Sequence, residues 1–174
     1  MPFSKCRLKN QIKSELQNTD LKCAVTGGAL SVLIGIISGM LTRSFNCAQI
    51  LVFPKCALPS FLLILLWLAL YFPIGAAAGI IVFSNNRCHT KYKCRGLLYF
   101  AAMFCLCILW QPTLFRAKLI FCAFVILCAV IALNFFVILN FFVINRVSGV
   151  VMTLYWFFLL YFAYLNLAMV FLNS

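Results

Sequence analysis

The sequence predicts an all-α integral membrane protein, built as a bundle of five transmembrane helices. Hydrophobic residues make up 66% of the chain and charged residues 9%, whereas a soluble domain is about half apolar and about a quarter charged. The apolar residues gather in five long, nearly uncharged runs, and a helix needs roughly 20 such residues to cross a bilayer. Spanning strands are about ten residues long and alternate in polarity, so a β-barrel does not fit.

The first element is a basic tail over residues 1–22, which we expect to be solvated or to form a short surface helix. It contains both acids of the protein and five basic residues: Glu15, Asp20, Lys5, Arg7, Lys9, Lys13 and Lys22. The apolar run that follows, Cys23 to Thr42, is longer than the 7–15 residues of a signal-peptide core. We therefore predict that it stays as the first helix of a membrane domain over residues 23–174.

Four further apolar runs predict the other helices. The second helix is expected from about Pro59 to Phe83, the third from Leu97 to Trp110 or slightly beyond, the fourth from Leu119 to Ile144 and the fifth from Gly149 to Leu172. With these five crossings the two ends of the chain lie on opposite sides of the membrane.

The basic residues predict which side is which. Ten lie in the tail, in the connection from Ser84 to Gly96 and at Arg146, whereas the other side has four, Arg43, Lys55, Arg116 and Lys118. The positive-inside rule then places the N-terminus in the cytoplasm and the C-terminus on the opposite side. Because the basic residues are split among short connections, they form no continuous basic face, and we expect no nucleic-acid partner.

Small residues recur every four positions in two of the predicted helices. The first helix has Gly27, Ser31, Gly35 and Gly39, and the second has Gly75 and Gly79. Such ridges let two helix backbones approach closely in a membrane. We expect them to serve packing within the bundle, with homodimer contact as the alternative.

The apolar runs have no Asp, Glu, Lys, Arg or His in their middle parts. Ion-coupled carriers and hydrolytic membrane enzymes need ionisable groups at that depth, so both classes are disfavoured. Cys88, His89 and Cys94 lack the C-x-x-C spacing of a zinc site, and we expect no bound metal. Cys47 and Cys56 share one connection; we favour two free thiols over a disulfide.

Three segments resemble the translocator protein / tryptophan-rich sensory protein (TspO/MBR) family, and the resemblance runs from about residue 24 to the end of the chain. The segment from Pro54 to Gly79 is similar to the family's first loop and second helix, and WQPTLF to its third-helix motif W-x-P-x-F-F. The matching residues in the three segments are Pro54, Pro59, Trp67, Leu70, Tyr71 and Gly75; Trp110, Pro112 and Phe115; and Tyr155, Leu165, Asn166, Leu172 and Asn173.

The chain also departs from the family pattern at several positions. Cys107 stands where bacterial members have Asn, Leu154 replaces a Pro, Phe158 a Trp and Phe162 an Ala. The basic residue of a sterol-recognition motif near the end of the fifth helix is missing at Val170 and Phe171, which disfavours sterol binding of that kind.

The resemblance implies a pocket among the helices that binds tetrapyrroles, such as protoporphyrin or haem, or other apolar ligands, with no cofactor required. The expected lining residues are Trp67, Tyr71, Cys107, Trp110, Phe115, Tyr155, Phe158, Phe162 and Asn166. The segment from Arg43 to Leu58, bordered by Pro59 and with Pro54 and Lys55 within it, is expected to act as a lid, and Arg43 or Lys55 to meet porphyrin propionates. An interhelical hydrogen bond is the alternative role of Asn166.

Sensing, sequestration or transport of such a ligand is the function that these features favour. Some family members break down porphyrin in light, but Phe158 in place of Trp makes this the weaker expectation. The alternative from another class is a non-catalytic scaffold or assembly protein without a pocket.

Overall fold

A computed structural model of the chain describes residues 21–41, 60–84 and 90–172. The helices are α2 (Leu21–Leu41), α4 (Ser60–Phe83), α5 (Thr90–Phe115), α6 (Ile120–Ile144) and α7 (Arg146–Leu172). The described residues contain no strand, and all five helices are long and apolar enough to cross a membrane. The predicted all-α membrane bundle is confirmed.

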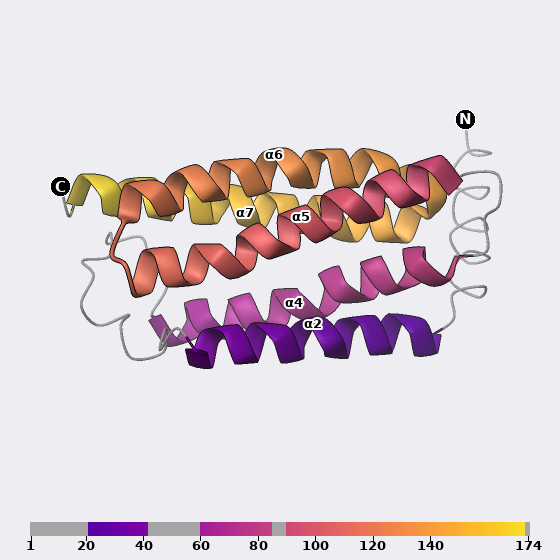
Figure 1. Cartoon of the computed structure of the whole chain (residues 1–174), viewed down its shortest axis with the longest axis horizontal. Helices are drawn as coiled ribbons and strands as arrows, with labels where there is room; N and C mark the ends of the chain where they lie inside the picture. Colours follow the sequence, from indigo (N-terminus) through magenta and orange to yellow (C-terminus); the bar gives the residue numbers. More distant parts are fainter. Residues whose placement is uncertain (1–20, 42–59, 85–89, 173–174) are drawn as a thin grey trace, which may run out of the picture.

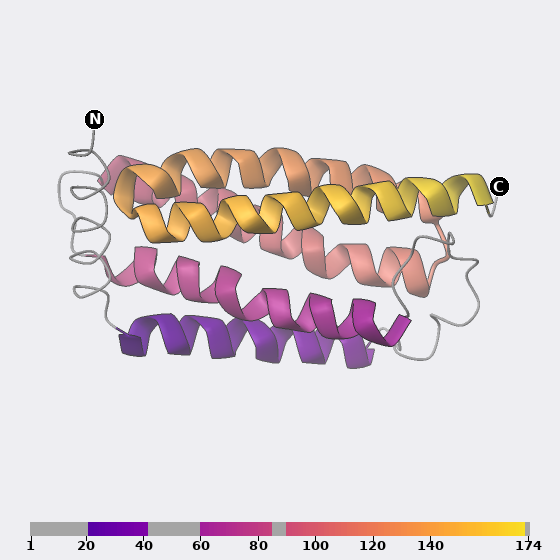
Figure 2. The same ribbon diagram turned by 180° about the vertical axis from the view of Figure 1, so that it is seen from behind.

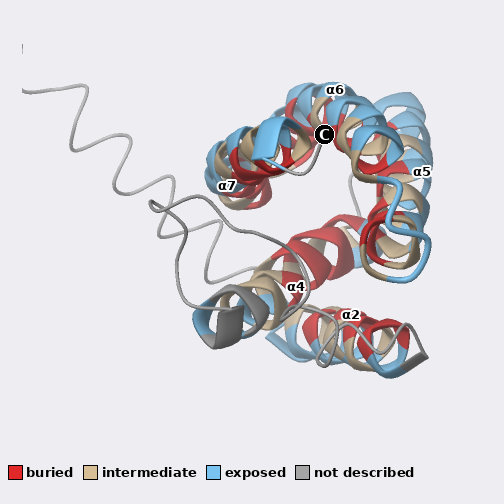
Figure 3. Cartoon of the chain, turned by 90° about the vertical axis from the view of Figure 1, so that its left-hand side faces the viewer, coloured by how far each residue is buried: buried red, intermediate tan, exposed pale blue. Residues whose placement is uncertain are grey.

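The helices run side by side and alternate in direction, so that the start of α2 and the end of α7 lie at opposite ends of the bundle (Figures 1 and 2). Helix α2 packs along α4, while α5, α6 and α7 pack in that order. The two groups meet mainly where α4 contacts α7 and, less extensively, α5. The end-on view in Figure 3 shows α5, α6 and α7 as an arc that faces α4, with their buried residues turned inward.

Three helix boundaries, both ends of α5 and the start of α7, differ from the predictions. Helix α5 begins at Thr90 instead of Leu97 and ends at Phe115 instead of near Trp110, and α7 begins at Arg146 instead of Gly149. Hydropathy locates only the part of a helix that lies in the hydrocarbon. The helix itself can continue into the membrane interface, where its residues are polar. The segment from 90 to 96, predicted as connection, is therefore helical, and Pro112 lies inside the last part of α5.

Asn145, the only residue between α6 and α7, explains why α7 begins at Arg146. Its backbone is extended, and its side-chain oxygen accepts hydrogen bonds from the backbone amides of Val147 at 2.9 Å and Ser148 at 3.1 Å. An Asn in this position is an N-cap, which satisfies amides that the first helical turn leaves unpaired. The cap lets α6 and α7 form a tight antiparallel hairpin.

The small-residue ridges of α2 and α4 face each other. A Cβ added to Gly27 would lie 2.5 Å from the backbone oxygen of Gly75, and one added to Gly75 would overlap the side chain of Ser31. A Cβ on Gly79 would overlap the backbone oxygen of Cys23. The two ridges therefore form the contact between α2 and α4 within one molecule, and these glycine surfaces are not available to a second copy.

Farther along α2, the remaining ridge residues serve the bundle interior. Gly35 leaves room for the ring of Tyr71, since a Cβ there would lie 2.8 Å from it. Gly39, one turn on, is buried as well.

Helices α6 and α7 pack through residues spaced alternately by four and three positions. On α6 the buried stripe is Ala123, Leu127, Val130, Asn134, Val137, Phe141 and Ile144, and on α7 it is Ser148, Met152, Tyr155, Leu159, Phe162, Asn166 and Met169. This spacing is the one used by helices that cross at a shallow angle in left-handed bundles. The stripe of α7 places three predicted ligand residues toward the interior.

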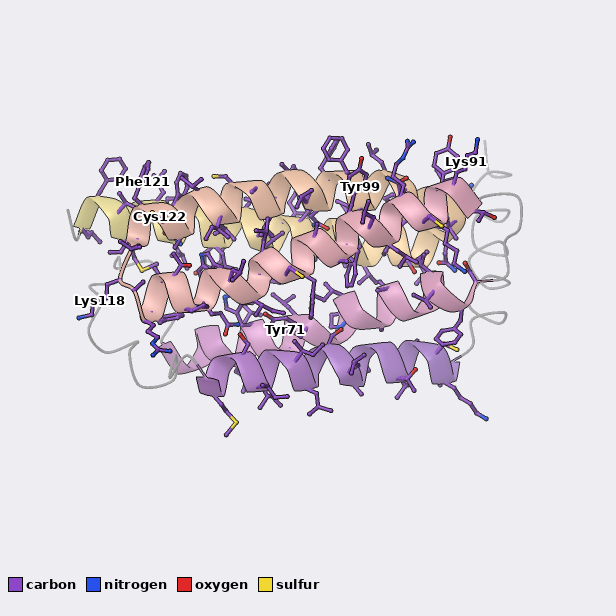
Figure 4. The ribbon with its side chains drawn as sticks, in the orientation of Figure 1. Tyr71, Lys91, Tyr99, Lys118, Phe121 and Cys122 are labelled. Carbon is purple, nitrogen blue, oxygen red and sulfur yellow. The ribbon has the colours of Figure 1, made fainter. Side chains whose placement is uncertain are left out.

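The outer surface of the bundle is apolar. Large side chains such as Leu30, Phe121 and Phe171 are well exposed, and Figure 4 shows Phe121 and Cys122 pointing away from the helices. A surface of this kind is suited to contact with lipid. The protein is thus an integral, multi-pass membrane protein.

Candidate functional site

The candidate site is an aromatic cluster where α4 meets α5 and α7. Trp67 of α4 is at its centre: its ring stacks on Trp110 of α5 with centroids 5.1 Å apart and an interplanar angle of 23°. On α7, the ring of Phe162 lies 4.8 Å from that of Trp67 at an angle of 46°. Trp67 therefore contacts an aromatic ring from each of the two opposing helices.

Further rings extend the cluster in both directions. Tyr71 lies one turn after Trp67, with centroids 6.1 Å apart, and meets Phe104 of α5 edge to face at 5.7 Å. At the other side, Phe115 contacts Trp110 edge to face at 6.1 Å. Offset and edge-to-face contacts of this kind are the favourable geometries for aromatic pairs. Figure 4 shows Tyr71 between the α2–α4 pair and α5.

A chain of polar side chains joins three helices beside the cluster. Ser38 Oγ of α2 donates to Gln111 Oε1 of α5 at 3.3 Å, and Gln111 Nε2 donates to the hydroxyl oxygen of Tyr71 at 3.3 Å. All three side chains are buried. These hydrogen bonds link α2, α4 and α5 at the side of the aromatic cluster.

Cys107 and Tyr155 form a second polar contact, between α5 and α7. The thiol sulfur lies 3.5 Å from the phenol oxygen, and both side chains are almost completely buried. The thiol occupies the site where bacterial members of the resembled family have an Asn, so a weak hydrogen-bonding group replaces a strong one.

Asn166 holds the base of the cluster together. With its amide oriented so that both polar atoms are paired, its oxygen accepts from Trp110 Nε1 at 3.1 Å and its nitrogen donates to the backbone oxygen of Ile120 at 3.2 Å. The side chain is fully buried. Its position supports the interhelical role weighed for it, and it fixes one edge of the Trp110 ring.

The structure brings together eight of the nine predicted ligand residues: Trp67, Tyr71, Cys107, Trp110, Phe115, Tyr155, Phe162 and Asn166 lie in or beside the cluster. Phe158 is the exception and corrects the prediction, because 37% of its surface is exposed. Three residues along a helix from Tyr155 leave Phe158 roughly 60° from it around the helix axis, on the side away from Leu159, so Phe158 lies at the edge of the inward face.

Several predicted features lie outside the described residues. These are the lid residues Arg43, Pro54, Lys55 and Pro59, the cysteines Cys47, Cys56 and Cys88, His89, Asn173 and residues 1–20 of the tail.

Three participants were missed by the sequence reasoning: Ser38, Phe104 and Gln111. The signal for Gln111 was present, since it is a polar residue inside the apolar third run and belongs to the WQPTLF segment. Ser38 and Phe104 give no such signal, because an isolated Ser or Phe is common in a membrane helix.

The described part of the cluster contains aromatic rings, hydroxyls, the thiol of Cys107 and the side-chain amides of Gln111 and Asn166. It contains no Asp, Glu, Lys, Arg or His. Among the described residues, no three potential metal ligands lie together. Such an arrangement can hold a flat, mostly apolar molecule through ring stacking and a few hydrogen bonds. It offers no charged group for acid–base chemistry.

Comparison with known proteins supports a family assignment. A family model described as the TspO/MBR family matches residues 28–172, which includes all five described helices except the first turns of α2. No curated protein matches the chain.

Proposed function

The chain belongs to the TspO/MBR family, and from this premise we propose that it binds a planar tetrapyrrole, protoporphyrin or haem, between α4 and the helices α5 and α7. The observation that carries the proposal is the position of Trp67, which contacts Trp110 on one opposing helix and Phe162 on the other. A tetrapyrrole offers two broad aromatic faces and can replace these ring contacts with stacking of the same kind.

The boundary between the two helix groups is suited to such an exchange. Individual aromatic pairs contribute about 0.5–1.5 kcal/mol beyond their burial, and the polar contacts that cross the boundary beside the cluster are 3.3 Å long. Away from the cluster, Ser148 Oγ donates to the backbone oxygen of Ala77 at 3.2 Å and Lys93 Nζ to that of Ser84 at 3.0 Å. By contrast, the α2–α4 contact depends on backbone atoms packed without intervening side chains. A ligand that parts the groups at the aromatic boundary breaks the weaker of the two interfaces.

The location of the cluster supports entry from the end where α2 finishes and α4 begins. Trp67 is seven residues after the start of α4, about two turns of helix. Trp110 is five residues before the end of α5. We propose that the segment between α2 and α4, with Arg43 and Lys55, covers this end and meets the propionates.

The proposed role is binding in the service of sensing, sequestration or transport. At the depth of the cluster the described residues include no carboxylate, amine or imidazole. The groups there that can donate a proton are the Cys107 thiol and the hydroxyls of Tyr71 and Tyr155, which are weak acids. Light-dependent breakdown of porphyrin remains the weaker proposal. It is tested by illuminating the purified protein with protoporphyrin and following the absorption spectrum for a new product.

The orientation is also a proposal. Five described basic residues lie at the end where α2, α5 and α7 begin, namely Lys22, Lys91, Lys93, Arg95 and Arg146, and two, Arg116 and Lys118, lie at the other end. The positive-inside rule supports a cytoplasmic N-terminus. Labelling single-cysteine variants of a cysteine-free chain from either side of intact vesicles tests it.

Binding is tested by titrating the protein in detergent with protoporphyrin while tryptophan fluorescence is recorded. We expect saturable quenching with the wild type and a clearly weaker affinity for Trp67→Phe. Trp156→Phe is the matched control, because Trp156 has no ring contact with the cluster in the described structure. Equal affinity of both variants would remove Trp67 from the site.

A second measurement separates binding from the scaffold alternative. A ligand that binds only the folded protein raises its stability, by about 2.7 kcal/mol at a concentration 100 times the Kd. We expect protoporphyrin to raise the unfolding temperature of the wild type in detergent. No rise with either protoporphyrin or haem would favour a scaffold without a ligand site.

A further inference from the structure

The outer face of α5 combines positive charge with an exposed apolar stripe. Positions spaced by four and three residues along it are all exposed: Lys91, Arg95, Leu98, Ala102, Cys105 and Leu109. The first two are cationic and the other four are apolar. We call this set the α5 outer stripe.

The charged end of the stripe has no carboxylate to neutralise it among the described residues. The only acids of the chain are Glu15 and Asp20, outside the described helices. Figure 4 shows Lys91 at the start of α5, directed away from the bundle. Lys91 and Arg95 are four residues apart and so lie on one side of the helix, one turn from each other.

A neighbouring lysine shows the contrast. Lys93 is partly buried and its ammonium donates to the backbone oxygen of Ser84 at 3.0 Å, at the end of α4. It therefore serves to join α5 to α4. Lys91 and Arg95 are on the other side of α5, toward solvent and headgroups.

The apolar part of the stripe has the length of one bilayer leaflet. From Leu98 to Leu109 it covers twelve residues, or eleven steps of 1.5 Å and roughly 16 Å in length, and one leaflet of hydrocarbon is about half of 30 Å. Leu98 and Leu109 are 68% and 54% exposed, and the exposed residues between them on the stripe, Ala102 and Cys105, have small side chains.

Helix α6 lies beside the upper part of the α5 outer stripe. The ring of Tyr99 on α5 contacts that of Phe136 on α6 with centroids 5.4 Å apart, and Gly96 allows close approach, since a Cβ there would lie 2.9 Å from Asn140 Cβ. Tyr99 lies near the crossing of α5 and α6 in Figure 4. An acyl chain along the stripe would have one aromatic side.

We propose that the α5 outer stripe is a binding site for one anionic phospholipid, with its phosphate between Lys91 and Arg95 and an acyl chain along Leu98 to Leu109. Charge complementarity selects the anionic headgroup, and the apolar stripe directly below the cations selects a lipid over a soluble anion. The opposite end of α5 lacks this combination: Arg116 and Lys118 lie in the turn after the helix, and Lys118 has a left-handed backbone with φ 55°.

The test is native mass spectrometry of the full chain in detergent, mixed with equal amounts of phosphatidylglycerol and phosphatidylcholine. A basic side chain near a membrane surface contributes roughly a fivefold preference for anionic lipid. We expect the wild type to retain phosphatidylglycerol several-fold over phosphatidylcholine, and Lys91→Gln with Arg95→Gln to abolish most of that preference. The control pair Arg116→Gln with Lys118→Gln removes the same charge and should keep it.

Two further arms separate a lipid site from a site for any anion. Ala102→Trp, which places a bulky ring on the apolar part of the stripe and leaves both cations in place, should lower retention of phosphatidylglycerol. Glycerol phosphate, which has the headgroup chemistry without acyl chains, should not displace the lipid at equal concentration. An equal loss of preference in the control pair, or displacement by glycerol phosphate, would overturn the proposal.

Discussion

Substitution of Gly75 by Ala tests the contact between α2 and α4 most directly. The added Cβ would lie 2.5 Å from Ser31 Cβ and would also overlap Ser31 Oγ and the backbone oxygen of Gly27. Ordinary contacts between such atoms are at 3.5–4.0 Å, so α2 must move away by about 1 Å. Backbone cannot rotate out of the way as a side chain can.

The expected cost follows from that displacement. Overpacking of a tight interface costs about 1–3 kcal/mol. The gain of about 1 kcal/mol that Ala has over Gly in a helix is small in a membrane, because an isolated helix stays helical there. We expect a net loss of about 2 kcal/mol, which corresponds to a fall in Tm of roughly 4–8 °C for a domain of this size.

The measurement is thermal unfolding in detergent, followed by tryptophan fluorescence at several protein concentrations. Ala29→Val is the matched control, since Ala29 is exposed on α2 and added methyl groups there meet detergent. The double variant of Gly27→Ala and Gly75→Ala should lose less than the sum of the single variants, because the first opens the interface for the second. An unchanged Tm, or a loss that appears only on dilution, would refute internal packing and point to contact between copies.

Three buried or capping asparagines give further predictions for the same thermal assay. Asn166→Leu leaves Trp110 Nε1 and the Ile120 carbonyl without their partner, and should cost about 1–3 kcal/mol; a smaller change would show that both groups find other partners. Asn134→Leu should be near neutral, because the lost hydrogen bond from Nδ2 to the Met152 backbone oxygen, 3.3 Å long, is offset by removal of the buried Oδ1, which has no partner in the described structure, and a marked loss of Tm would contradict this. Asn145→Ala should cost about 1 kcal/mol through the lost N-cap, whereas Asn145→Asp should retain most of the stability; equal loss in both would assign the effect to something other than capping.

The sequence predicted the fold well because the signal for a membrane helix does not depend on its neighbours. Hydropathy and length alone locate each crossing. The small-residue ridges, which begin at Gly27 in α2 and at Gly75 in α4, indicate where the two backbones meet. The ends of α5 were predicted less well, since Thr90 and the basic residues after it are helical for reasons of hydrogen bonding and not of hydropathy. An Asn between two apolar runs, as at Asn145, is itself a signal for a helix N-cap.

The candidate site residues were predicted through resemblance and by position on the helices, and the structure places one of them, Phe158, outside the aromatic cluster. Phe158 aligned with a family Trp, but the inward face of α7 is set by Tyr155, Leu159 and Phe162, which form one side of the helix. The polar Gln111 can be noticed in the sequence, but its hydrogen-bond partners cannot be predicted. They come from α2 and α4, and no local pattern shows which helices will be neighbours. Contacts between distant segments, such as Ser38 with Gln111, follow from the assembled bundle alone.

Phe162 decides how readily the proposed site accepts its ligand. Its ring lies 4.8 Å from that of Trp67 at a position where the family pattern has Ala, so it occupies space that a tetrapyrrole stacked on Trp67 would need. Phe162→Ala should destabilise the free protein by about 3–5 kcal/mol through the cavity that it leaves. It should also bind protoporphyrin more tightly than the wild type, because the ligand then fills that cavity and has no ring to displace.

The two effects of Phe162→Ala give opposite signs in one experiment. Without ligand the Tm should fall, and the rise in Tm with saturating protoporphyrin should be larger than for the wild type, since binding energy is added to a looser folded state. Leu159→Ala is the matched control, because Leu159 is also a fully buried α7 residue and has no ring to stack on Trp67. If Phe162→Ala weakened binding as Trp67→Phe is expected to do, the ring of Phe162 would be part of the ligand's stack, and the space for the ligand would have to lie on the Trp110 side of Trp67.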